Sequence, residues 1–182
     1  MKKLIVVLFF TSCSMGGTDV FKKAFVSDAQ IADQTLEQVM SAIQKEDKEA
    51  LKNLFSKKCV ADTEDFDAKV TALMDYYKGE MTSYNNWGAL NTNEGMNEDG
   101  TGRSWKNLQA TYDVDTDKTG YRVAFQTYVK DTADADNIGI YSFYVIKAED
   151  MDMQIAYWGD GKWTPGINID IKRYAGTPRL LV

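Results

Sequence analysis

The repeat of the hydrophobic pattern changes once along this chain, close to Gly79. Before Gly79 apolar residues recur every three or four positions, as in an amphipathic helix, and after it they alternate, as in a strand. We predict helices over residues 28–45, 47–55 and 63–77, and strands over residues 81–90, 105–114, 121–130 and 138–146. We also expect a polar loop at residues 91–102, a hairpin at 157–163 and an edge strand at 165–171. Helices that precede a run of strands are typical of the α+β class.

Turn-forming residues between the central strands predict how the layers are arranged. Residues 115–120 and 131–137 are rich in Asp, Asn and Gly, which favour tight turns and therefore an antiparallel meander. We expect the N-terminal helices to pack on a curved antiparallel sheet that wraps around the long first helix as a cone with one open end. This α+β cone domain covers residues 28–171, and residues 172–182 form a tail.

The N-terminus has the features of an export signal. Lys2 and Lys3 precede an apolar run at residues 4–10, which is too short to span a bilayer but has the size of a secretory signal core. Small residues then lead to Cys13, which resembles the lipidation motif of bacterial lipoproteins. We predict a lipoprotein signal peptide at residues 1–12, a lipid on Cys13, a tether at 13–27, and a lipid-anchored protein on the extracytoplasmic face of the cell membrane. The alternative is an ordinary signal peptide that is cut elsewhere.

Composition excludes several classes of function. The chain contains no histidine, so Ser-His-Asp and Cys-His catalysis and histidine-ligated metals are excluded. Its net charge is −6, with no basic block, which predicts no nucleic-acid partner. The carboxylates from Asp113 to Asp117 resemble the start of a calcium loop, but Lys118 stands where such a loop needs glycine. We therefore predict no catalytic residue, no metal site and no cofactor.

Three segments carry a resemblance to a known family. They are residues 48–56 (KEALKNLFS), the Gly139–Tyr141 triplet (GIY) and the Tyr157–Gly159 triplet (YWG). Together with the order of the helices, they resemble an uncharacterised family of small bacterial lipoproteins, a domain of unknown function that is similar to the nuclear transport factor 2-like, or cystatin-like cone, superfamily. The resemblance implies the cone fold and the lipid anchor over about residues 28–170. It implies no activity, because this superfamily contains isomerases, dehydratases, binding modules and immunity proteins.

Large aromatic side chains are the best candidates for a binding site. Tryptophan and tyrosine at the open end of a cone can stack on a sugar or enclose an apolar ligand, although the same rings can instead fill the core. Arg122 lies between apolar neighbours in a predicted strand, and the sequence leaves open whether it faces solvent or the interior. The candidate ligand-binding residues are Tyr77, Trp87, Trp105, Arg122, Tyr128, Tyr144 and Trp158.

Three functions follow from these features. The preferred one is a lipid-anchored, extracytoplasmic and non-catalytic module that binds a small molecule, a glycan or a protein partner. The second is a partner-binding or immunity-type interaction protein that docks through its sheet. The third is an isomerase or dehydratase that works with Asp and Tyr alone, for which Asp75 and Asp131 are the candidate carboxylates.

Overall fold

The structure is a computed structural model that describes residues 26–88, 90–96, 100–154 and 156–172. The signal peptide, Cys13, most of the tether and the tail from residue 173 lie outside the described residues. Within the described part, the helices are α2 (Asp28–Gln44), α3 (Lys48–Asn53), α4 (Lys57–Asp62) and α5 (Phe66–Tyr76). The strands are β1 (Met81–Asn86), β2 (Asn91–Met96), β3 (Ser104–Thr116), β4 (Gly120–Asp131), β5 (Gly139–Lys147) and β6 (Gly166–Ile169). Two short 3-10 turns, η1 (Ala135–Asn137) and η2 (Ala148–Asp150), flank β5.

Helix α2 forms where its sequence supplies both a cap and an apolar stripe. Ser27 Oγ accepts a hydrogen bond from the Gln30 amide, and the Gln30 side chain accepts one from the Ser27 amide, so both free amides are satisfied. The apolar stripe includes Leu36, Met40 and Ile43, all of which are buried. The expected first helix is therefore confirmed.

The expected third helix is present as α5, and an additional short helix, α4, precedes it. Ser56 caps α4 by accepting from the Cys59 amide, and α4 ends at Asp62. Helix α5 starts only at Phe66, after Asp65 has taken a left-handed backbone conformation with φ of 53°. Helix α4 was missed because one and a half turns are too short to show a hydrophobic repeat.

The sheet runs in the order β1-β3-β4-β5-β6, and β2 also pairs with β3. Strand β3 is long enough that β1 pairs with its C-terminal part and β2 with its N-terminal part. The expectation of a polar loop at 91–102 was wrong for β2, because the free edge of β3 pairs with this segment although it has no alternating pattern. Within the described residues, 157–163 contain no strand, so the expected hairpin is not formed.

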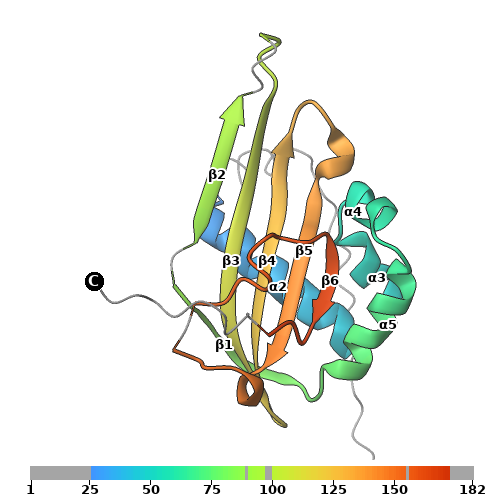
Figure 1. Ribbon diagram of the computed structural model, residues 1–182, viewed down its shortest axis with the longest axis vertical. Coiled ribbons are helices and arrows are strands. Elements are labelled where there is room, and N and C mark those ends of the chain that lie inside the picture. Colours follow the sequence, from blue (N-terminus) through green and yellow to red (C-terminus); the bar gives the residue numbers. More distant parts are fainter. Residues whose placement is uncertain (1–25, 89, 97–99, 155, 173–182) are drawn as a thin grey trace, which may run out of the picture.

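The expected edge strand is present as β6, but it pairs in parallel with β5. The sheet is therefore mixed rather than wholly antiparallel. The reason is topological: after β5 the chain crosses back over the sheet before it enters β6, so both strands run in the same direction (Figure 1). The α+β class is confirmed.

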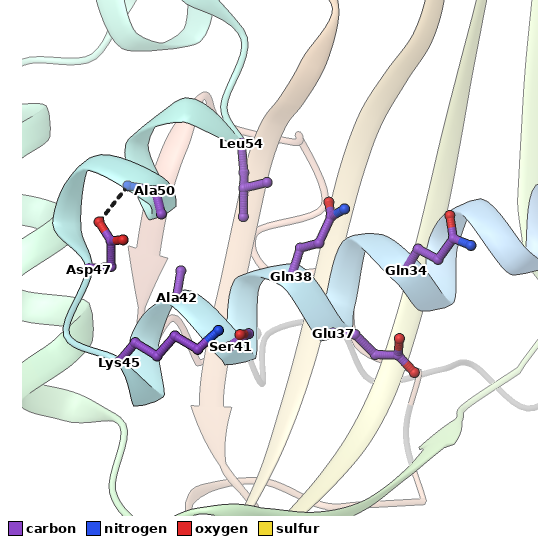
Figure 2. Close-up of a pocket in the computed structure, with 9 residues that line it drawn as sticks. All are labelled: Gln34, Glu37, Gln38, Ser41, Ala42, Lys45, Asp47, Ala50 and Leu54. Carbon is purple, nitrogen blue, oxygen red and sulfur yellow. Dashed lines mark hydrogen bonds between the residues drawn. The ribbon is translucent and has the colours of Figure 1, made fainter. Parts of the chain in front are cut away.

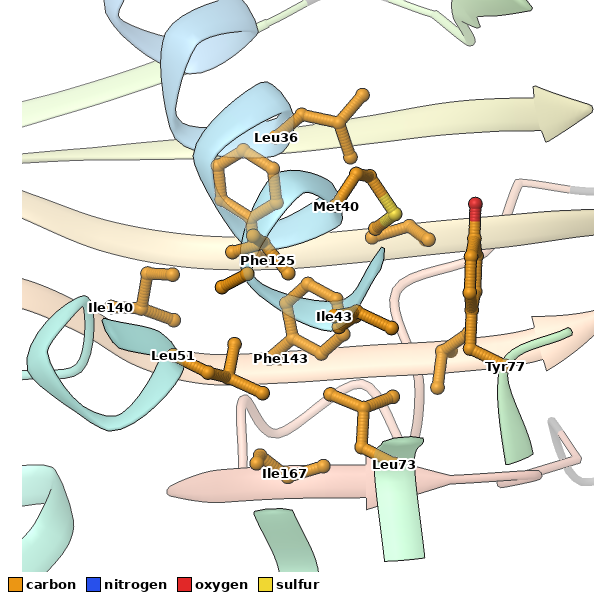
Figure 3. Close-up of a cluster of buried hydrophobic side chains, with 14 of the residues drawn as sticks. Leu36, Met40, Ile43, Leu51, Leu73, Tyr77, Phe125, Ile140, Phe143 and Ile167 are labelled. Atoms are coloured by element: carbon orange, nitrogen blue, oxygen red, sulfur yellow. The ribbon is translucent and has the colours of Figure 1, made fainter. Parts of the chain in front are cut away.

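The two faces of the sheet are covered by different kinds of structure. In Figure 1, α2 lies behind the sheet, α3, α4 and α5 lie beside β6, and residues 156–165 cross in front of β3, β4 and β5. Alternation along β4 directs Val123 and Phe125 into the main core with α2, and directs Arg122 and Ala124 to the opposite face. Figure 3 shows the main core, where residues of α2, α3 and α5 pack against β4, β5 and β6.

We call the face of the sheet that is opposite α2 the second face. The crossing segment, which we define as residues 156–165, forms a small core of its own there. Tyr157 packs there with Ala124, Tyr144 and Ile146. The segment is also hydrogen-bonded to β5, because Ser142 Oγ donates to the Thr164 carbonyl at 2.6 Å. Backbone on this face is therefore held by side chains of the sheet.

Two of the three sequence segments that carried the family resemblance meet in the fold. Phe55 and Ile140 form a parallel bridge, in which the Ile140 amide donates to the Leu54 carbonyl and the Ser56 amide donates to the Ile140 carbonyl, both at 2.9 Å. Gly139 makes this approach possible, because a Cβ atom there would lie 2.8 Å from the Ser56 nitrogen. This bridge fastens the end of α3 to the start of β5.

We expect Gly139→Ala to lower the free energy of unfolding by about 2–4 kcal/mol, since it combines a backbone clash with a φ of 121°. Gly100→Ala is the matched control, because Gly100 also has a positive φ but has open space around it, and it should cost about 1 kcal/mol. Chemical denaturation of both variants measures the difference. Equal losses in the two variants would show that the bridge at Gly139 is not tightly packed.

Candidate functional site

Three tryptophans surround a hollow of about 450 Å³ on the second face of the sheet, between β3 and the crossing segment. We call it the indole hollow. Gln109 and Thr111 of β3 form its floor. The first wall is formed by Trp87 and Gly88, from the connection between β1 and β2, and by Asn91 at the start of β2. The second wall is formed by Ala156, Trp158, Gly161 and Trp163 of the crossing segment.

Arg122 supports the first wall from beneath. Its side chain is 0% exposed, and its Nε and Nη2 atoms donate to the two carboxylate oxygens of Asp113 at 2.6 and 3.0 Å. Nη2 also donates to the Met153 carbonyl at 2.8 Å, and the guanidinium carbon lies 4.3 Å from the centre of the Trp87 ring. Arg122 thus joins the sheet, the Trp87 ring and the chain that leads into the crossing segment.

Tyr144 supports the second wall from β5. Its hydroxyl donates to Asp160 Oδ1 at 2.7 Å and accepts from the Thr164 amide at 2.7 Å. Gly159 packs directly against the Tyr144 ring, since a Cβ atom at that position would overlap the ring. Trp158 and Trp163 are therefore held on backbone that is fixed to the sheet.

The ionisation states of this pair favour the same arrangement. Burial raises the pKa of Tyr144, and the hydrogen bond to Asp160 raises it further. Burial alone would raise the pKa of Asp160, but hydrogen bonds from Thr164 and Tyr144 outweigh it and hold that pKa below its ordinary value. Around neutral pH Tyr144 is therefore a protonated donor and Asp160 an ionised acceptor.

A family model described as a domain of unknown function, DUF5104, matches residues 38–157. The chain belongs to this family. The match confirms the expected membership of an uncharacterised domain family, and no curated protein matches the chain. The DUF5104 match includes the floor of the indole hollow, Trp87 and Arg122, and it ends one residue before Trp158.

The structure brings together four of the seven candidate ligand-binding residues of this DUF5104 protein. Trp87 and Trp158 line the indole hollow, and Arg122 and Tyr144 support its walls. The question of which face Arg122 occupies is answered: it lies opposite α2, buried under Trp87.

The other three candidates do not line the indole hollow. Tyr77 belongs to the main core, where it stacks on Tyr121 and is 4% exposed, because it ends α5 against the helix-covered face. Trp105 lies over Gly95 of β2, and Tyr128 packs against Tyr141. Their positions follow from the end of α5 and from the packing of the strands rather than from a shared site.

Sequence reasoning missed the residues of the floor and of the outer rim. Trp163 lies in the segment expected to form a hairpin and Asn91 at the start of the expected polar loop, and neither is among the candidate ligand-binding residues. Gln109 and Thr111 could have been found, because alternation along β3 sets them opposite the core residues Ala110 and Tyr112. The alternation along β3 identifies Gln109 and Thr111 as residues of the hollow only when it is known which face of the sheet the helices cover.

Neither of the carboxylates proposed for acid–base chemistry, nor the buried cysteine, is suited to catalysis. Asp75 is exposed on α5. Asp131 accepts hydrogen bonds from the Asn137 side chain and from the amides of Ala133 and Asp134, which lower its pKa, whereas a base at neutral pH needs a raised one. Cys59 is buried, and burial raises the pKa of its thiol to about 11, so it is a poor nucleophile.

A second hollow, of about 460 Å³, lies between α2 and α3 (Figure 2). Most of the side chains that line it are exposed and polar, among them Gln34, Glu37 and Gln38. Asp47 is already engaged there, since its carboxylate caps α3 by accepting from the Ala50 amide at 2.9 Å. Unlike the indole hollow, this one contains no aromatic side chain among its described lining residues.

In the described part of the chain, no helix has the length and apolar character needed to cross a membrane.

Replacing Arg122 tests whether it holds the first wall. We expect Arg122→Met to lower the free energy of unfolding by about 3 kcal/mol, because it leaves the Asp113 carboxylate without its buried partner. Lys106→Met is the matched control: Lys106 pairs with Asp28 at 2.8 Å, but both are partly exposed, so the loss should be about 1 kcal/mol or less. Urea denaturation measures both variants, and a loss at Arg122 no larger than that at Lys106 would contradict the supporting role.

Proposed function

We propose that this DUF5104 protein is a non-catalytic binding module, held on the extracytoplasmic face of a bacterial membrane by a lipid on Cys13, with its ligand site in the indole hollow. The observation that carries the proposal is the set of three indoles around a polar floor. Binding sites for small ligands are concave, mostly apolar and equipped with a few polar groups, and the volume of this hollow falls in their usual range.

The fixed walls support a binding role. Trp158 is 37% exposed, although Gly159 beside it packs tightly on Tyr144. A large apolar ring that is held in water by rigid backbone loses little further freedom when a ligand covers it. The hollow is therefore organised before any ligand arrives.

The chemistry of the lining supports binding rather than catalysis. None of the described residues that line the indole hollow is an acid, a base or a nucleophilic thiol. A proton-transfer mechanism needs such a group within hydrogen-bond reach of its substrate. The amides and hydroxyl of the floor are suited instead to orienting a bound molecule.

We also propose kinship with the cystatin-like cone superfamily. The support is the arrangement in which the long helix α2 lies across one face of a twisted sheet that is not closed (Figure 1). The indole hollow lies on the opposite face, so this proposal differs from the expected site inside the cone.

Tryptophan indole signals test the position of the site. In ¹⁵N-labelled protein we expect a mixed library of sugars, peptides and small aromatics to contain a ligand that shifts the indole signals of Trp87, Trp158 and Trp163 but not that of Trp105. Trp158→Ala should abolish those shifts, and Trp105→Ala, the matched control, should preserve them. Shifts confined to Trp105, or no shift with any compound, would contradict a ligand site in the indole hollow.

The lipid anchor is supported by Lys2, Lys3, the apolar run at residues 4–10 and the position of Cys13. When the full chain is expressed in bacteria supplied with labelled palmitate, we expect the protein to carry the label in the membrane fraction. Cys13→Ala should remove the label, whereas Cys59→Ala, which alters the other cysteine, should retain it. A soluble, unlabelled protein that still begins at Met1 would refute the anchor.

A further inference from the structure

The indole hollow has polar groups without charge. Its floor and rim present the side-chain amides of Gln109 and Asn91 and the hydroxyl of Thr111. The hydrogen bonds of the described residues leave both of these amides without a protein partner. Thr111 Oγ1 donates to the Tyr157 carbonyl at 3.1 Å, so its oxygen remains available as an acceptor. On this side, a ligand would therefore meet hydrogen-bond donors (the amide NH₂ groups) and hydrogen-bond acceptors (the amide and hydroxyl oxygens).

The positive charge that lies beneath Trp87 is already neutralised. Arg122 has its positive charge paired with both carboxylate oxygens of Asp113, and Trp87 covers its guanidinium. An anionic ligand would therefore gain little from Arg122 and would lose its own hydration. Because none of the described lining residues is charged either, the lining favours a neutral molecule.

The walls select for flat apolar surface. Trp87 stands on one side of the floor, and Trp158 and Trp163 stand on the other. A wholly apolar ligand would cover these rings but would leave the amides of Gln109 and Asn91 buried without partners, which is unfavourable. A ligand that fits must present apolar faces to the indoles and hydroxyl or amide groups to the floor.

From this combination we infer that the indole hollow binds a neutral sugar ring of a glycan, an inference that rests on the proposed function of the same site. The C–H faces of a pyranose are apolar and stack on indole rings, whereas its hydroxyl groups, which both donate and accept, lie around its edge. Trp87 and Trp158 would contact the faces of the ring, and Gln109 would bind its hydroxyl groups.

Titration calorimetry on the full chain in lipid nanodiscs, without sugar-based detergent, tests this inference. The probes are neutral trisaccharides of α-glucose, β-glucose, N-acetylglucosamine, mannose, galactose and xylose, together with an anionic galacturonate trisaccharide and a tyrosine-containing tripeptide. We expect at least one neutral trisaccharide to bind with a dissociation constant of about 10 µM to 1 mM, and to bind more tightly than the galacturonate.

Variants separate the contributions of the indoles and of the floor. Gln109→Ala should weaken binding of the neutral sugar about tenfold, as expected for a lost hydrogen bond. Trp158→Ala should abolish binding, whereas Trp105→Ala should leave it unchanged. Denaturation midpoints of the three variants, compared with that of the parent, show whether any loss of binding is a loss of folding.

Each other outcome overturns the inference in a recognisable way. Preferential binding of the galacturonate would show that the hollow selects for anions, and binding of the tripeptide alone would show a peptide site. In both cases the indole shifts persist and the proposed binding function stands. If no probe binds and no compound of the wider library shifts an indole signal, both the sugar inference and the proposed function fail.

Discussion

The buried ion pair between Arg122 and Asp113 is the interaction on which the second face of this protein depends. A guanidinium that is fully removed from water requires a carboxylate and further acceptors, and here Asp113 and the Met153 carbonyl supply them. Because Asp113 and Arg122 face each other across β3 and β4, the pair also joins the two longest strands. The Trp87 ring lies against the guanidinium. One arginine therefore connects the sheet to the Trp87 wall of the indole hollow and to the chain that leads into the crossing segment.

The two faces of the sheet differ in how they are covered, and this difference produces the candidate site. On the first face, helices bury a continuous apolar core (Figure 3). On the second face, a segment without regular structure is held by individual contacts, such as those of Tyr144 with Asp160 and Thr164. A helix would have filled the space beside β3, whereas an extended segment leaves part of the strand uncovered and surrounds it with its own tryptophans. Membership of the DUF5104 family assigns no ligand, so a binding role is supported by this geometry alone.

The sequence predicted those helices and strands that are determined by local signals, such as a capping residue or the repeat of apolar residues. The Ser27 cap and the apolar stripe define α2, and alternation defines β3, β4 and β5, so these were recovered almost to the residue. Elements that depend on a neighbour were not: β2 pairs with a free edge of β3, and β6 runs parallel only because the chain returns across the sheet. The same limit applies to the site. Trp87 and Trp158 could be identified as candidates from the sequence, but Tyr77 could be separated from them only once the structure showed it in the core at the end of α5. The face on which Arg122 lies could be assigned only once the structure showed which face α2 covers.

The central claim is that residues 156–165 are fastened across the second face of the sheet, so that the indole hollow exists before any ligand binds. Hydrogen exchange at the Thr164 amide tests this most directly, because that amide donates to the Tyr144 hydroxyl at 2.7 Å, outside any helix or strand. We predict exchange at least about a hundredfold slower than in an unfolded chain, and loss of this protection in Tyr144→Phe while amides of β3 and β4 remain protected. Exchange of Thr164 at the rate of an unfolded chain in the unaltered protein would contradict the claim.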